Sequence, residues 1–93
     1  MLTLNRHFQP HPDVVDTPLD NDETVLLHLT RSAYYTLNPT GSRIWRGLKQ
    51  GWSLQDISHS LQQVFEVDAQ RADRSVLALV QELSENELVQ PPN

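Results

Sequence analysis

Four histidines are the side chains in this sequence best suited to hold a metal ion or to move a proton: His7, His11, His28 and His59. No pair has the H-E-x-x-H spacing of a zinc-binding helix, and none stands beside a serine–aspartate pair. His7 and His11 are four residues apart, but their segment has no helical pattern. His28 lies among leucines, where a hydrogen-bonded structural role is expected. The histidines therefore predict neither a metal site nor a catalytic centre.

The carboxylates and glycines also lack a pattern that would support catalysis. Asp20, Asp22 and Glu23 resemble the start of a calcium loop, but the glycine and the distal glutamate of that motif are missing. The three glycines all fall within residues 41–51 and form no phosphate-binding loop. Because the chain has no cysteine, disulfides, thiolate metal sites and a cysteine nucleophile are excluded, and a cytoplasmic location is favoured. We predict a protein that is not an enzyme and needs no cofactor.

Binding is then the expected activity, and the charge distribution indicates the kind of partner. The net charge of −5 divides into −4 over residues 1–23, +4 over 24–55 and −5 over 56–93. A basic middle between acidic ends suits an acidic or polar peptide better than a DNA backbone, although a solvated surface gives the same pattern. No apolar stretch approaches the roughly 20 residues of a membrane span, and no secretion signal is seen, so no membrane partner is expected.

Alternating apolar residues predict a three-stranded antiparallel sheet in the first part of the chain. A short strand begins at Val14 and is closed by Pro18, and residues 23–29 form the second strand. After a turn at residues 30–32, Ala33–Leu37 forms the returning strand. A single domain of 93 residues is the expected size for such a sheet and the helices that follow it.

Three helices are predicted after the sheet from their capping residues. Asn38 is a good N-cap for the first helix, which Gly51 ends in a left-handed conformation. Ser53 caps the second helix and Asp68 the third, which ends near Asn86. The order β-β-β-α-α-α predicts an α+β, winged helix-turn-helix-like domain over residues 13–89, preceded by an N-terminal arm (1–12) and followed by a tail (90–93).

A winged-helix fold raises the alternative of a DNA-binding regulator. The third helix would read the duplex, and Arg71 and Arg74 open it. The same helix, counted from its cap, carries four carboxylates: Asp68, Asp73, Glu82 and Glu85. Because a duplex binder gains affinity by neutralising phosphates, a net negative helix argues against nucleic acid. The other alternative is a structural or dimerisation domain, which would form a homodimer.

Two adjacent tyrosines on the returning strand face opposite sides of the sheet. One of Tyr34 and Tyr35 can join the core, while the other faces solvent, a partner or the sheet surface. An exposed strand edge with aromatic neighbours can accept an extended peptide by strand addition. Ala33, Tyr34, Tyr35, Thr36 and Leu37 are therefore predicted to bind a peptide.

The third helix is predicted to form the other wall of this peptide site. Its buried stripe consists of Val76, Val80 and Leu83. Leu77 is displaced from that stripe and shares a helical row with Arg74 and Gln81. We expect these three residues to lie at the cleft between strand and helix, where Leu77 would offer a pocket to a peptide side chain. A scattered surface leucine is the alternative.

Two parts of the sequence resemble the PqqD family. The first is the strand pair followed by Leu37-Asn38-x-x-Gly41-x-x-Ile44-Trp45, and the second is the set of apolar positions between Asp56 and Val89. The resemblance covers roughly residues 13–89. It implies a recognition element of ribosomally made, post-translationally modified peptide (RiPP) pathways, in which a winged-helix module binds the leader of a precursor peptide and presents it to a modifying enzyme.

The resemblance also implies where the leader lies and which partner enzymes are involved. The leader is implied to add as a strand to Ala33–Leu37 and to rest against the helix over Arg71–Leu83. The partner would be a leader peptidase, a cyclase or a radical SAM enzyme. Members from the coenzyme-PQQ pathway commonly carry a Tyr-Pro-Glu-Gly-like stretch between the hairpin strands, and this chain has Thr30–Tyr35 instead. That makes it more similar to the stand-alone leader-binding proteins of lasso-peptide pathways.

Overall fold

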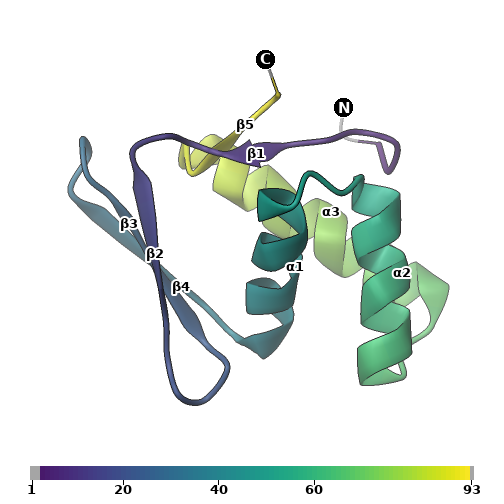
Figure 1. Ribbon diagram of the computed structural model, residues 1–93. Coiled ribbons are helices and arrows are strands. Elements are labelled where there is room, and N and C mark those ends of the chain that lie inside the picture. Colours follow the sequence, from purple (N-terminus) through teal and green to yellow (C-terminus); the bar gives the residue numbers. More distant parts are fainter. Residues whose placement is uncertain (1–2, 93) are drawn as a thin grey trace.

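An antiparallel sheet of three strands stands beside three helices in the computed structural model, which describes residues 3–92 (Figure 1). The strands of this sheet are β2 (Val14–Pro18), β3 (Thr24–His28) and β4 (Ala33–Leu37). The helices are α1 (Pro39–Lys49), α2 (Leu54–Phe65) and α3 (Ala69–Glu85). Two short strands, β1 (Gln9–Pro10) and β5 (Val89–Gln90), form a second sheet. The predicted α+β fold, a three-stranded sheet followed by three helices, is confirmed.

The three-stranded sheet has the order β2-β3-β4, so β2 and β4 are its two edge strands. Residues of β3 alternate between the two faces as predicted, and Leu26 and His28 point into the core. On the outer face, the register places Val15 opposite Leu27 and Leu27 opposite Tyr34. This row crosses all three strands, and the side chains at both of its ends are exposed.

The helices begin where their capping residues predict. The Asn38 side chain accepts a hydrogen bond from the Gly41 N–H at 2.7 Å. Ser53 Oγ accepts one from the Asp56 N–H at 3.1 Å, and Asp68 caps α3 in the same way. Each cap satisfies an amide that has no partner within its own helix, which fixes the start of the helix.

Two glycines of the first helical region have different roles. A Cβ placed on Gly47 would stand 2.6 Å from Ile57 Cγ1, so the missing side chain lets α1 and α2 pack closely. Gly51 has a φ of 81° and ends α1 in the predicted left-handed conformation. The close approach at Gly47 joins α1 and α2 into one packed unit.

The core lies between the inner face of the sheet, the three helices and the N-terminal segment. Trp45 is 2% exposed, as expected for the apolar stripe of α1. Helix α3 contributes its predicted stripe, and all three of its members are fully buried. The other buried apolar residues are Phe8, Leu26, Leu37, Ile44, Leu48, Leu54, Ile57, Leu61, Ala72, Leu88 and Val89.

The N-terminal segment belongs to this fold, which the sequence analysis did not predict. Phe8 is 3% exposed, and β1 pairs with β5 through Gln9 opposite Gln90 and Pro10 opposite Val89. The Leu54 N–H also donates to the Arg6 carbonyl at 3.0 Å. The described part of the expected arm, residues 3–12, is therefore packed on the domain, and the expected tail begins inside β5, while residues 1, 2 and 93 lie outside the described residues. Two-residue strands are too short to show a period, so β1 and β5 could not be predicted from alternation.

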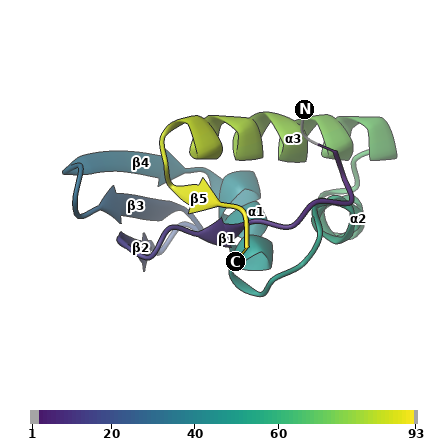
Figure 2. The ribbon, with the colours of Figure 1, turned by 90° about the horizontal axis from the view of Figure 1, so that it is seen from above.

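Helix α3 runs alongside β4, the nearest to it of the three sheet strands (Figure 2). This placement determines which flank of the helix meets the free sheet edge. Within residues 3–92, none of the helices has the length and apolar character needed to cross a membrane.

Candidate functional site

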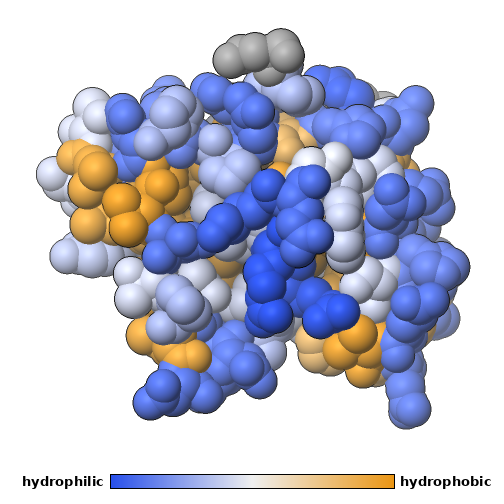
Figure 3. Space-filling model, in the orientation of Figure 1, coloured by the Kyte–Doolittle hydropathy of each residue, from blue (hydrophilic) through white to orange (hydrophobic). Residues whose placement is uncertain are grey.

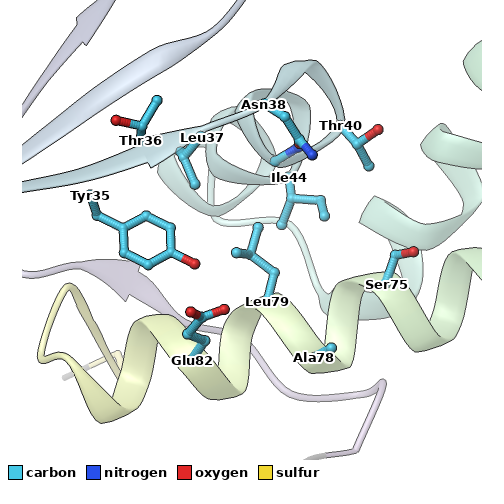
Figure 4. Close-up of a pocket in the computed structure, with 11 residues that line it drawn as sticks. Tyr35, Thr36, Leu37, Asn38, Thr40, Ile44, Ser75, Ala78, Leu79 and Glu82 are labelled. Atoms are coloured by element: carbon cyan, nitrogen blue, oxygen red, sulfur yellow. The ribbon is translucent and has the colours of Figure 1, made fainter.

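A groove of about 470 Å³ lies between β4 and α3 (Figure 4). Its walls come from three parts of the fold: the second half of β4, the first turns of α1 and one flank of α3. The lining residues are Tyr35, Thr36, Leu37, Asn38, Thr40, Gly41, Ile44, Ser75, Ala78, Leu79 and Glu82.

The floor of the groove is apolar and its two ends are polar. Leu37 and Ile44 are each 1% exposed, and the half-buried Leu79 side chain points toward them from α3 (Figure 4). Thr40 and Ser75 stand at the end near α1. An apolar floor with polar ends can hold an apolar side chain and hydrogen-bond the backbone that carries it.

Tyr35 and Glu82 face each other at the other end of the groove (Figure 4). Burial of the phenol, together with the neighbouring Glu82 carboxylate, raises the pKa of Tyr35 to about 12. A phenol is protonated at neutral pH even without this shift, so Tyr35 is a hydrogen-bond donor there, and the raised pKa extends this state into alkaline solution. This end of the groove combines a neutral donor with a carboxylate acceptor.

The edge of β4 beside the groove has no partner strand among the described residues. Its sequence, Ala-Tyr-Tyr-Thr-Leu, contains neither a proline nor a charge. An edge strand directs every second set of N–H and C=O groups outward, so β4 offers main-chain hydrogen bonds next to a side-chain groove. Strand addition needs both features.

The predicted strand residues divide between the groove and the surface around it. Tyr35, Thr36 and Leu37 line the groove. Tyr34 points to the outer face of the sheet and is 75% exposed, and Ala33 is exposed at the start of the strand. The side chains of the two adjacent tyrosines thus face opposite sides of the sheet as expected, and Tyr35 packs partly against the core.

Leu77, which was predicted to lie at the strand–helix cleft, does not line this groove, and neither do Arg74 and Gln81. Leu79 occupies the cleft instead. The two leucines are two positions apart and therefore about 200° apart around α3. Leu77 is half-buried against the core on the other flank. Leu79 could have been found from a second row at i, i+3, i+4 and i+7 spacing, which is Ser75, Ala78, Leu79 and Glu82.

The buried histidine has the structural role that its sequence context predicts. His28 is 2% exposed and its Nδ1 accepts a hydrogen bond from the Arg31 N–H at 3.3 Å. The ring of His11 lies against it, with ring centroids 4.7 Å apart. Within residues 3–92, no group of three histidine or acidic side chains is placed to hold a metal ion.

The outer face of the sheet exposes a second set of apolar side chains. Val15 is 46% exposed and Leu29 is 58% exposed, and Leu27 joins Val15 to Tyr34 across the strands. Figure 3 shows apolar surface gathered over this part of the sheet. The groove and this outer face lie on opposite sides of β4.

Fold and groove define an α+β winged-helix domain with an open peptide-sized groove along a free sheet edge. The chain belongs to the PqqD family, because the family model for coenzyme PQQ synthesis protein D (PqqD) matches residues 23–89. The predicted family resemblance is thereby confirmed. Among curated proteins, no relative matches the chain.

Two solved structures share this fold over nearly their whole length. The structure described as TbiB1 in complex with the TbiA(beta) leader peptide is 30% identical, with a TM-score of 0.84 over 91% of this chain and 98% of the other. The structure of lasso peptide synthetase B1 complexed with the leader peptide is 32% identical, with a TM-score of 0.83 over 91% of this chain and 99% of the other.

Proposed function

We propose that this protein is a RiPP recognition element that binds the leader of a precursor peptide by strand addition to β4. The observation that carries the proposal is the coincidence of a free, uncharged strand edge with a groove beside it that has an apolar floor and polar ends. The similar structures described above hold leader peptides, and because one of them is a lasso peptide synthetase B1, a lasso precursor is the favoured partner.

The groove suggests how such a leader is held. In an extended peptide, successive side chains point to opposite faces, so every second one faces the groove when the backbone pairs with β4. Leu37, Ile44 and Leu79 would enclose an apolar leader side chain, and Tyr35 with Glu82 would meet a polar one. The sequence-based assignment of Arg74, Leu77 and Gln81 to the peptide site stays a prediction, and the groove favours Ser75, Leu79 and Glu82 in their place.

We also infer that the module is not itself an enzyme and that it presents the leader to a modifying enzyme, such as a leader peptidase, a cyclase or a radical SAM enzyme. The exposed outer row of Val15, Leu27 and Tyr34 supports this role. A leader strand on β4 would extend that face with its own outward side chains, so one enzyme surface could contact both. The alternative is that two copies of this protein form a homodimer through the same outer face of the sheet.

DNA binding receives no support from the position of α3. The helix carries two arginines against three carboxylates, and one of its flanks is occupied by the groove to β4. A helix with more acidic than basic side chains gains little affinity from a phosphate backbone.

A proline scan tests strand addition directly. The probe is a synthetic peptide carrying the leader encoded by the precursor reading frame beside this protein's gene, here called the leader probe. A proline within the paired segment removes a ladder hydrogen bond, so isothermal titration should show a loss of about 1–3 kcal/mol there and little at either end. A flat scan, or no binding of the unmodified leader probe, would contradict the proposed function.

A further inference from the structure

The outer side of α1 carries a basic surface that the proposed function does not use. Arg43, Arg46 and the capping residue Gln50 follow one another at spacings of three and four, so they share one face of the helix. Together with Trp52 they form what we call the basic α1 face. They line a cavity of about 100 Å³, whose other walls are Gly47 and Ser60. Figure 3 shows strongly hydrophilic surface in the middle of the view, over the position of α1 in Figure 1.

The basic α1 face points away from the groove. On α1 the groove is lined by Thr40, Gly41 and Ile44, and none of them borders the basic cavity. Arg46 follows Ile44 by two positions and is therefore about 200° from it around the helix. A leader held along β4 would leave the basic α1 face free, so this face can serve a different molecule.

Trp52 is held on this face in a fixed position. Its backbone N–H donates to the Gly47 carbonyl at 3.1 Å. A Cβ placed on Gly47 would stand 3.2 Å from Trp52 Cε3, so the indole ring packs closely against α1 where the helix has no side chain. The tryptophan is nonetheless 37% exposed. An aromatic side chain that is already ordered loses little conformational entropy on binding, and tryptophan is among the residues that contribute most to protein interfaces.

Two arginines beside Trp52 supply positive charge. Within residues 3–92, the salt bridges include neither Arg43 nor Arg46. Arg43 Nε donates to Ser60 Oγ at 3.1 Å, which fixes that guanidinium between α1 and α2. Residues 24–55, which contain both arginines, have no acidic side chain. A carboxylate that approaches this face would therefore meet two guanidinium groups, whose planar forks suit carboxylates.

An acidic loop borders the basic α1 face on one side. Arg46 also lines a larger cavity of about 380 Å³ between α1 and the connection from β2 to β3, together with Asp22 and Glu23. The charge along this surface thus changes from positive near Trp52 to negative near Glu23. A continuous phosphate backbone would be repelled at the loop, whereas a folded protein can present carboxylates at one end of the contact only.

We propose that the basic α1 face docks an acidic segment of the modifying enzyme, with enzyme carboxylates on Arg43 and Arg46 and an apolar enzyme side chain against Trp52. The inference rests on the proposed function, since a module that presents a leader must also hold the enzyme that receives it. Because this face and the groove are separate, the enzyme and the leader bind at the same time.

Charge reversal on α1 tests this contact. The probes are the modifying enzymes encoded beside this protein's gene, purified and titrated with and without the leader probe. Arg46→Glu should weaken binding of the docked enzyme by about tenfold or more, because it brings like charges together, and added salt should weaken binding to wild type. Arg31→Glu is the matched control. It makes the same change in charge at the turn between β3 and β4, where only an exposed ion pair with Glu87 is lost, so enzyme affinity should change less than about twofold.

Trp52→Ala tests the apolar part of the contact and should weaken enzyme binding by about tenfold. Both Trp52→Ala and Arg46→Glu should bind the leader probe within about twofold of wild type. Leu79→Glu should show the reverse pattern, with weakened leader binding and unchanged enzyme affinity in the absence of leader. Circular dichroism and the Tm check that each variant folds, and Trp52→Phe gives the conservative comparison at the indole position.

Three results would overturn the docking site. It is wrong if Arg46→Glu and Arg31→Glu behave alike, or if none of the enzymes binds wild type. It is also wrong if sedimentation shows a dimer that Arg46→Glu dissociates, because a second copy would then occupy the face. The proposed function survives each of these results when the leader probe binds and Leu79→Glu weakens that binding, and it fails when Leu79→Glu has no effect.

Discussion

The two edges of the three-stranded sheet are built in opposite ways. On β2, Asp16 accepts hydrogen bonds at 2.7 Å from both Trp45 Nε1 and Lys49 Nζ, and Pro18 closes the strand. On β4, the strand contains neither a proline nor a charge, and an open groove runs along it. Charges and prolines on edge strands prevent unwanted pairing with other chains, so β2 is a protected edge and β4 is not.

This difference indicates which of the two edges binds a partner. A small domain that leaves an edge free risks aggregation, so an unprotected strand beside an open groove indicates a partner that covers it. On the protected edge, Asp16 fixes β2 to α1 through two long-range contacts. We expect substitutions near β2 to change stability and substitutions near β4 to change affinity.

Trp45→Ala should have the largest effect and should act on stability. The side chain is 2% exposed, and its loss leaves a core cavity and removes a donor from Asp16. Urea denaturation should show a loss of about 3–5 kcal/mol, a large part of the stability of a domain of this size. Trp52→Ala is the matched control, because Trp52 is 37% exposed and should cost much less. If the Trp45→Ala protein is as stable as the Trp52→Ala protein, α1 does not anchor the β2 side of the fold.

Leu79→Glu should have an intermediate effect and should act on affinity. A charge in the apolar floor of the groove must be desolvated when a leader side chain enters, so binding of the leader probe should fall by about tenfold or more. Leu77→Glu is the comparison on the opposite flank, where the groove predicts little change in affinity. Titration with the Tm of each variant separates binding from folding. A loss of affinity in Leu77→Glu alone would restore the sequence-based site and reverse the comparison.

Local signals in the sequence were sufficient for most of the fold. Capping side chains act over three or four residues, so Asn38, Ser53 and Asp68 could be assigned from their neighbours alone. Alternation over five residues likewise gave the bounds of β4 correctly. The buried stripe of α3 followed from its helical spacing. These features depend on interactions between residues close in the chain.

The parts that were missed depend on contacts between distant residues. The pairing of β1 with β5 joins segments from opposite ends of the chain, and neither segment is long enough to show a pattern. Helical spacing placed the stripe of α3, but it could not show whether the flank with Leu77 or the flank with Leu79 meets β4. The Asp16–Trp45 hydrogen bond spans 29 positions and had no local signature either.

The smallest expected effect is a pH dependence at the protected edge. Partial burial acts to raise the pKa of the Asp16 carboxyl, but the hydrogen bonds from Lys49 and Trp45 and the charge of Lys49 outweigh it, so the pKa lies below its usual value. A lowered pKa in the folded state means that ionised Asp16 stabilises the fold above the unfolded-state pKa of about 4. This contribution is lost as the pH falls through the folded-state value.

Asp16→Asn isolates this contribution, because the amide oxygen can still accept from Trp45 while the charge is removed. The variant should be less stable than wild type at neutral pH, and the difference should shrink as the pH is lowered below about 4. Urea unfolding at a series of pH values measures it, with Lys49→Gln and the double variant completing a cycle that gives the coupling between the two charges. Leader affinity should stay unchanged throughout, because β2 and β4 are opposite edges. If Asp16→Asn weakens leader binding while stability is unaltered at every pH, the division between a structural edge and a binding edge is wrong.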